Sequence, residues 1–168
     1  MNREGLIEIK GPNIMLGYWN RPDKTASVLK NGWYDTGDMG LIDDEGFLHI
    51  TGRISRFSKI GGEMVPHLSV EEAVNAELGA AEGDLLAVVT AVPDRAKGER
   101  LIVFHLPTAH DPRDVVRRLT EHGLPNLWIP GADAFAEIDE LPMLGSGKLD
   151  LKRLSDMAKE RFVEATNA

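Results

Sequence analysis

The chain has 168 residues, 42% of them hydrophobic, which is enough for a folded core and argues against disorder. Its net charge of −8 argues against a general nucleic-acid-binding surface, because neutralising phosphates requires clustered excess cations. The sequence has no cysteine, no apolar run near the roughly 18 residues of a membrane-spanning helix, and a polar start at residues 1–4, so it predicts no disulfide, membrane span or signal peptide.

The first fifty residues predict short strands and one helix. Residues 6–9 alternate weakly between apolar and polar side chains, which predicts a strand. Residues 22–29 begin with Pro22 and end before Asn31-Gly32, which predicts a helix. Residues 40–50 predict a hairpin, because two apolar runs flank an aspartate-rich turn that ends in glycine. This stretch is too short to bury a core alone, so it predicts the edge of a larger domain.

The rest of the chain predicts one compact domain. Residues 57–65 alternate around a glycine pair and predict a second hairpin. The segment Ser69-Val70-Glu71-Glu72 predicts a capping box at the start of a helix, because the serine and the last glutamate can satisfy each other's backbone amides. Residues 85–92 and 101–106 are dense in Val, Ile and Leu, which is typical of buried strands.

Three further elements complete the expected fold. A helix is predicted to begin at Asp111-Pro112, a strand to cover residues 135–141, and a last helix to cover residues 151–162 with a regular apolar stripe. The predicted fold class is therefore α+β: a small mixed sheet flanked by about three helices, preceded by a short β-rich segment. We place the boundary between residues 1–52 and residues 53–168.

The first of three polar motifs is Tyr34-Asp35-Thr36-Gly37-Asp38. Its Thr-Gly pair predicts a tight turn that presents the carboxylate of Asp38 beyond the start of a strand. One carboxylate can accept two hydrogen bonds from a vicinal diol such as that of a ribose, and its charge strengthens both. An ordinary solvated turn aspartate explains the same five residues equally well.

The second motif covers residues 52–63 and carries three cations at intervals of three residues, Arg53, Arg56 and Lys59. These cations lie close to the glycine pair Gly61-Gly62. Their spacing favours either contacts with a ligand or a solvated basic edge, which is a common feature of exposed strands.

The third motif is Leu141-Pro142-Met143-Leu144-Gly145-Ser146-Gly147-Lys148, which holds a lysine on a glycine-flanked loop. A cation on such a loop lowers the barrier when a carboxylate attacks a phosphate, because two anions must meet. Taken alone, Lys148 is better explained as an exposed surface lysine. A phosphate-binding P-loop is excluded, because Pro142 stands where its first glycine belongs and Leu149 follows the lysine.

In this order and spacing, the three motifs resemble the last three sequence motifs of the adenylate-forming enzymes. These enzymes include acyl-CoA synthetases, carrier-protein-loading adenylation domains and luciferase-like enzymes. The resemblance covers residues 5–162 and implies that residues 53–168 are the C-terminal lid domain, preceded by the edge of the large N-terminal domain. The phosphate loop, the adenine pocket and the acyl tunnel would then lie upstream.

The resemblance also implies roles in nucleotide binding and catalysis. Asp38 and Arg53 would bind the ribose of ATP and AMP. Lys148 would be the catalytic residue that assists attack of a carboxylate on the α-phosphate of ATP. The chain alone lacks the phosphate loop and the acyl pocket, so we expect it to be inactive by itself and to bind no cofactor tightly.

The same resemblance implies a hinge and a channel. Ser55 would be the hinge about which the lid rotates, although most members carry Asp or Lys at that position. Gly61 and Gly62, together with Lys59, would line the channel for a pantetheine arm, because only glycine lets the backbone approach an arm that closely.

Further matches point to one subgroup. Residues 11–18 precede the first motif as in the acyl-activating members of the family, whereas residues 59–65, 97–99 and the third motif look most like the acyl-[acyl-carrier-protein] synthetase half of bacterial 2-acylglycerophosphoethanolamine acyltransferases. This resemblance implies a ligase that activates a fatty acid with ATP and Mg²⁺ and loads it onto acyl carrier protein for lysophospholipid reacylation. It also implies a cytoplasmic enzyme, held at the inner face of the bacterial membrane through other parts of the protein.

Other interpretations stay open. One is the lid of an acyl-CoA synthetase, with coenzyme A as the acceptor. Another is a non-catalytic module that docks the acidic carrier protein through a basic edge, here defined as Arg53, Arg56 and Lys59 and extended by Arg117 and Arg118. A third, a retired structural subunit, is disfavoured because the candidate site residues are all present. The five histidines lack the spacing of metal ligands, so the sequence predicts no metal site.

Overall fold

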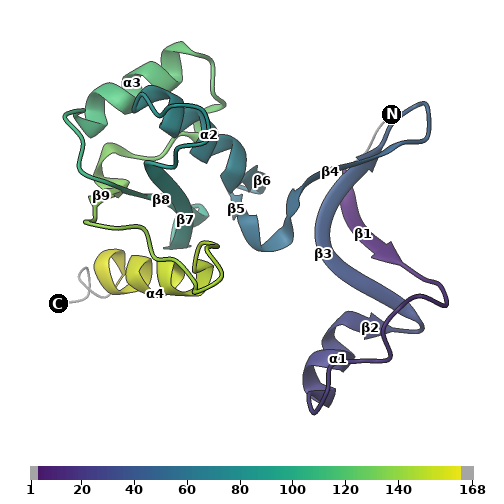
Figure 1. Ribbon diagram of the computed structural model, residues 1–168. Helices are drawn as coiled ribbons and strands as arrows, with labels where there is room; N and C mark the ends of the chain where they lie inside the picture. The colour runs from purple at the N-terminus through teal and green to yellow at the C-terminus, as the bar shows by residue number, and fades with distance from the viewer. Residues whose placement is uncertain (1–3, 164–168) are drawn as a thin grey trace. The chain divides into compact units, whose positions relative to one another are not determined.

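The computed structural model describes residues 4–163 and divides the chain into two compact units (Figure 1). The first unit ends at Arg56 and the second begins at Phe57. The predicted boundary between residues 52 and 53 falls inside β4 (Leu48–Arg53), the last strand of the first unit. The fold class is α+β, as predicted, with one small sheet in each unit.

The first unit is built around its longest strand. Antiparallel β1 lies on one edge of β3, and β2 and β4 share the other edge at opposite ends. The elements are β1 (Gly5–Ile9), α1 (Pro22–Val28), β2 (Leu29–Lys30), β3 (Trp33–Ile42), β4 and the 3-10 turn η1 (Ile54–Arg56). The predicted first strand, helix and hairpin are therefore all present.

The first unit has no core of its own. Among residues 4–56, no large apolar side chain is fully buried. On the hairpin of β3 and β4, by contrast, four large apolar side chains are more than half exposed: Ile42, Phe47, Leu48 and Ile50. A surface of this kind is typical of a segment that packs against further polypeptide.

The second unit has a mixed five-stranded sheet with β8 at its centre. β7 pairs with the whole of β8 on one edge, while β5 and β9 share the other edge, and only β9 runs parallel to β8. The elements are β5 (Phe57–Ile60), β6 (Glu63–Pro66), α2 (His67–Glu77), β7 (Ala87–Asp94), β8 (Gly98–His105), α3 (Pro112–Glu121), η2 (Asn126–Trp128), η3 (Ala132–Ala134), β9 (Phe135–Glu137) and α4 (Leu151–Phe162).

Three helices cover the two faces of this sheet. Helices α2 and α3 lie on one side of the sheet and α4 lies on the other (Figure 1). Because side chains alternate along a strand, Val89 and Val103 pack with α2 and α3, whereas Val88 and Ile102 pack with α4. The helix pair α2 and α3 contributes Val70, Val74, Val115 and Leu119 to its core, and α4 contributes Leu154 and Ala158. The predicted mixed sheet with about three flanking helices is confirmed.

Three details of the prediction are wrong. The capping box does not form: α2 begins earlier, at His67, whose buried ring lies 2.8 Å from the hydroxyl of Ser58, and the Pro66 cap makes no side-chain hydrogen bond. The first polar motif lies inside β3 and not ahead of a strand. β9 ends at Glu137, so the predicted strand over residues 135–141 is too long.

A buried amide joins α2 to β7. The side chain of Asn75 donates to the carbonyls of Glu71 and Ala87, each at 2.8 Å. Its oxygen accepts from the amides of Leu86 at 2.8 Å and Ala87 at 3.0 Å. Nearby, the Glu71 carboxylate accepts from the amide of Val89 at 2.9 Å. One side chain thus satisfies one carbonyl of α2 and three backbone groups at the start of β7.

We expect Asn75→Ala to lower the free energy of unfolding by about 2 kcal/mol or more, because it leaves buried backbone groups unpaired. Urea unfolding followed by circular dichroism measures this loss. The matched control is Asn126→Ala, at an exposed position of the same unit, which should change stability by less than about 0.5 kcal/mol. Equal effects of the two substitutions would contradict the structural role of Asn75.

Candidate functional site

Side-chain bonds shape the strand that carries Asp38. The Thr36 hydroxyl donates to the carbonyl of Ile7 at 2.8 Å and accepts from the amide of Asp38 at 3.0 Å. The carboxylate of Asp35 accepts from the amide of Gly37 at 2.8 Å, and Gly37 has a φ of +72°. These local bonds, which are those of a turn, form within β3 and fix the backbone that presents Asp38.

Asp38 and Arg53 lie side by side. They are register partners on β3 and β4, and Nε of Arg53 lies 2.9 Å from Oδ1 of Asp38. The carboxylate is 22% exposed and the guanidinium 67% exposed. The pair therefore places a charged acceptor beside several N–H donors, with room for a polar ligand such as a diol.

Tyr34 lies within electrostatic range of this pair and is joined to Tyr18, an arrangement that the sequence alone did not predict. A hydrogen bond with Tyr18 raises the pKa of Tyr34, and the charges of Arg53 and Asp38 also act on Tyr34. The ammonium of Lys24 lies 4.5 Å from the centre of the Tyr18 ring. The only sequence signal was that Tyr34 opens the first polar motif.

Ser55 lies in the short η1 turn and is exposed. The division between the two units follows one residue later, between Arg56 and Phe57. The predicted hinge residue therefore lies where the chain passes from one unit to the other.

Gly61 and Gly62 form the turn of the β5–β6 hairpin. Their φ angles are +59° and +93°, and the turn is closed by the pair Ile60 and Glu63, as expected for a type I′ turn. A Cβ on Gly61 would lie 3.4 Å from Leu127, whereas one on Gly62 would meet no atom within 4 Å. The backbone at Gly62 is thus open to a ligand. Lys59, on the same hairpin, is exposed.

Lys148 lies on a tight loop directly before α4. The loop is closed by a bridge between Met143 and Leu149 and by a hydrogen bond from the amide of Leu144 to the carbonyl of Lys148 at 2.7 Å. The Lys148 side chain is exposed and has no carboxylate at ion-pair distance among residues 4–163. An unpaired ammonium on an ordered loop can reach an anionic ligand without first breaking an ion pair.

The predicted basic edge is wrong at Arg56, which is only 7% exposed. Arg53 keeps an exposed side chain but is ion-paired with Asp38, and Lys59 is exposed. The interval of three residues predicted one face, but the η1 turn separates β4 from β5 and ends that regularity.

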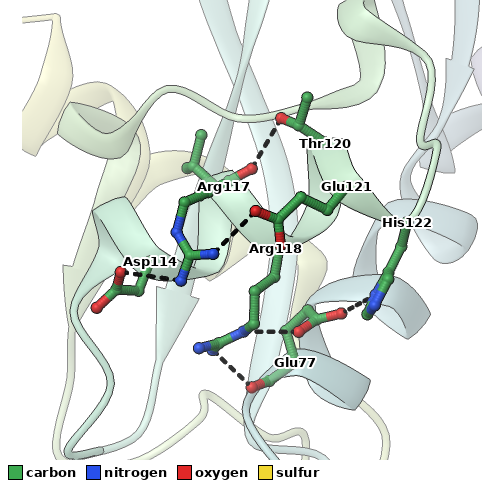
Figure 2. Close-up of polar contacts among 8 residues, drawn as sticks. Glu77, Asp114, Arg117, Arg118, Thr120, Glu121 and His122 are labelled. Atoms are coloured by element: carbon green, nitrogen blue, oxygen red, sulfur yellow. Dashed lines mark hydrogen bonds and ion pairs between the residues drawn. The ribbon is translucent and has the colours of Figure 1, made fainter.

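The proposed extension of that edge is also neutralised. On α3, Arg117 bonds Glu121 at 2.9 Å and Asp114 at 3.3 Å. Arg118 donates to the carboxylate of Glu77 at 2.8 Å and to its carbonyl at 3.1 Å, as Figure 2 shows. The ring of His122 lies 2.5 Å from the other oxygen of Glu77. These side chains join α2 to α3.

Neither a metal cluster nor a membrane span is evident in the part of the chain that the structure describes. Residues 4–163 contain no group of three or more His, Asp or Glu side chains placed to hold a metal ion. Within the same range, no helix combines the length and the hydrophobicity needed to cross a membrane.

Comparisons with known proteins identify similar sequences. No protein-family model matches the chain. The chain is 36% identical over 155 residues to a 2-succinylbenzoate–CoA ligase of Bacillus velezensis and 35% identical over 158 residues to a long-chain-fatty-acid–CoA ligase of Bacillus subtilis. These alignments cover 92% and 93% of this chain but 31% and 27% of the two ligases. The chain thus spans less than a third of the length of these relatives.

Solved structures agree with the sequence matches. ATP-bound MatB from Rhodopseudomonas palustris is 30% identical, with a TM-score of 0.76 over 94% of this chain and 31% of that chain. The o-succinylbenzoate CoA synthetase of Bacillus subtilis, in complex with its acyl-adenylate intermediate, is 30% identical with a TM-score of 0.74, over 90% of this chain and 30% of that chain. The chain therefore matches the C-terminal part of the adenylate-forming acyl- and aryl-CoA ligases.

The turn that connects the strands of Asp38 and Arg53 carries a pH-dependent contact. The His49 ring, 2.6 Å away, and the amide of Phe47 hold the pKa of Asp43 below its ordinary value of 3.8. Since folding lowers this pKa, the Asp43 carboxylate stabilises the folded hairpin above pH 3.8. This stabilisation is lost as the pH falls through the lowered pKa.

We therefore expect an NMR titration of the Asp43 carboxyl to give a midpoint below 3.8, which His49→Ala moves upward. The control is His110→Ala, at an exposed position of the second unit, which should leave the midpoint unchanged. A midpoint at or above 3.8 in the unaltered chain would show that the contact does not persist in solution.

Proposed function

We propose that this chain, which matches the C-terminal part of the adenylate-forming acyl- and aryl-CoA ligases, is the C-terminal fragment, lid included, of an ATP-dependent ligase that forms acyl-AMP and then a thioester. The observation that carries the proposal is the chain order of an Asp38–Arg53 pair, an open glycine turn and an unpaired Lys148 on a segment 35–36% identical to CoA ligases. The use of ATP is supported by two similar solved structures, one with bound ATP and one with a bound acyl-adenylate.

Asp38 and Arg53 would bind the ribose. The Asp38 carboxylate retains exposed surface beside the guanidinium, so it can accept hydrogen bonds from both hydroxyls of the ribose. Arg53 balances the charge of the carboxylate and offers further donors to the nucleotide. This contact holds ATP and AMP in the same place through both steps.

Lys148 would act in the first step. An oxygen of the substrate carboxylate attacks the α-phosphorus of ATP, the bond to the leaving pyrophosphate breaks, and acyl-AMP forms. The Lys148 ammonium would contact the oxygens on which negative charge gathers, which lowers the barrier without transferring a proton. The described residues offer no cluster for Mg²⁺, so we assign no Mg²⁺ ligand to this chain, and Mg²⁺ would enter with the phosphates of ATP.

The glycine turn would act in the second step. The acceptor sulfur attacks the acyl carbonyl, the bond to the phosphate oxygen of AMP breaks, and the thiol proton is released. Gly61 and Gly62, with Lys59 beside them, would let the pantetheine arm pass close to the backbone. Rotation about Ser55 would bring first Lys148 and then the glycine turn to the reacting atoms.

The remaining parts of the site would come from an upstream domain. The relatives are more than three times longer than the matched segment, and the first unit exposes an apolar hairpin. We infer that this hairpin packs against a large domain that carries the phosphate loop, the adenine pocket and the acid pocket.

Coenzyme A is the acceptor that we favour. The curated relatives described above are named CoA ligases, and the basic edge expected to dock an acyl carrier protein is weakened, because Arg56 is buried and Arg53 is ion-paired with Asp38. The subgroup resemblance at residues 59–65 and 97–99 supports the alternative, a fatty-acyl ligase that loads acyl carrier protein for lysophospholipid reacylation. At the thioester step, the two assignments differ in what carries the pantetheine thiol.

In a full-length protein that contains this segment, Lys148→Ala should slow ATP–pyrophosphate exchange by about 10²- to 10³-fold, because one cation aimed at a developing anion is lost. Thioester formation from preformed acyl-adenylate should be largely spared. The matched control is Lys152→Ala, which removes a surface lysine paired with Asp156 at 2.8 Å. Equal damage to both half-reactions would contradict the two-orientation mechanism.

A second assay tests the acceptor. The same full-length protein should release AMP with coenzyme A faster than with holo-acyl carrier protein at equal thiol concentration. A preference for the carrier protein would overturn our choice of acceptor and leave the adenylation step intact. If no carboxylic acid from an aliphatic and aromatic panel supports pyrophosphate exchange, the ligase assignment itself is wrong and a docking module becomes the better interpretation.

A further inference from the structure

The segment Lys97-Gly98-Glu99 holds the glycine turn against the central strand. We propose that Glu99 is a positioning residue for the thioester step, acting through the backbone of the β5–β6 hairpin. The inference rests on the proposed function for the role of the glycine turn, but the contacts themselves do not depend on it.

Glu99 replaces a missing strand contact. β5 and β8 are paired at a single position, between Ile60 and Gly98. The next amide along β5, that of Lys59, donates to Oε2 of Glu99 at 2.7 Å. A half-buried carboxylate therefore provides the acceptor that a longer strand pairing would have supplied. A hydrogen bond to a charged acceptor is also stronger than one to a carbonyl.

We call the contacts that residues 97–99 make with the β5–β6 hairpin the hairpin clamp. Two backbone contacts complete it. The amide of Gly61 donates to the carbonyl of Lys97 at 2.9 Å. Gly98 has a φ of +84°, and a Cβ there would lie 3.3 Å from the carbonyl of Lys59, so a side chain would press against the backbone of β5. The close approach of β8 to the hairpin thus requires glycine.

The clamp is itself built on an ordered turn. Oδ1 of Asp94 accepts from the amides of Ala96 at 2.9 Å and Lys97 at 2.8 Å. These bonds, that of Lys97 first, lower the pKa of Asp94. Asp94 therefore fixes the peptide whose carbonyl receives the Gly61 amide.

The clamp decides where the glycine turn lies. The other end of the hairpin is held by the buried contact between Ser58 and His67, and β6 is an edge strand. Near the turn, the contacts to β8 are those of the clamp and the single pair at Ile60. Releasing Glu99 would free the turn to move while the rest of the sheet stays ordered.

Hydrogen exchange in this chain tests the clamp directly. Glu99→Ala should speed exchange of the Lys59 amide by about tenfold or more, because its charged acceptor is lost. Glu99→Gln keeps an acceptor oxygen and should recover much of the protection. The amides of Val89 and Val103 should be unchanged in both variants. The control is Glu82→Ala, at an exposed position that precedes β7, at the end of that strand away from the clamp.

The two half-reactions of a full-length protein that contains this segment test whether Glu99 positions the glycine turn for the thioester step. Glu99→Ala should lower kcat for thioester formation from preformed acyl-adenylate by tenfold or more. The rate of pyrophosphate exchange should stay within twofold of that of the unaltered protein. Glu99→Gln should restore most of the lost thioester formation. A parallel loss in both half-reactions, or an unchanged thioester step, would overturn the proposal. Absence of pyrophosphate exchange in the unaltered protein would instead refute the proposed function, while the exchange of the Lys59 amide still decides whether the clamp exists.

Discussion

The second unit depends on the antiparallel pairing of β7 with β8, which is continuous from Ala87 and His105 to Asp94 and Gly98. β8 has strands on both edges and helices over both faces, so its side chains from Leu101 to His105 are almost completely buried. A shift by one residue would exchange the side chains that face α2 and α3 with those that face α4. On the other edge of β8, the hairpin clamp lies at the start of the strand and β9 pairs with its end. The two loops with proposed roles in catalysis are therefore attached to one sheet.

The sequence predicts the bounds of a helix best where its local pattern and its tertiary packing favour the same residues. The bounds of α4 match those predicted, because a regular apolar stripe follows Asp150, whose side chain accepts from the amide of Arg153 at 2.9 Å. At α2 the two preferences differ: Ser69 and Glu72 satisfy the pattern of a capping box, but the buried pair of His67 and Ser58 starts the helix earlier. A local pattern cannot report a partner on another strand.

The candidate site shows the same limit. The type of chemistry at Asp38, Arg53 and Lys148 could be inferred from residue types and order. That Asp38 and Arg53 form an ion pair could not, because it follows from the register of β3 with β4. Glu99 was noticed only as part of a resemblance, since its partner is a backbone amide forty residues earlier in the chain. Backbone partners leave no mark on the sequence.

The glycine turn has a consequence for how such a lid changes over evolution. Two residues without side chains offer a ligand only main-chain atoms, so under the proposed function the turn itself would not distinguish one thiol carrier from another by side-chain charge. Selectivity for the acceptor would then fall to neighbours such as Lys59, Glu63 and Met64, which are exposed beside the turn. Substitutions there would change the acceptor without changing the turn. Under the proposed function, one backbone turn would then suit ligases that use different acceptors.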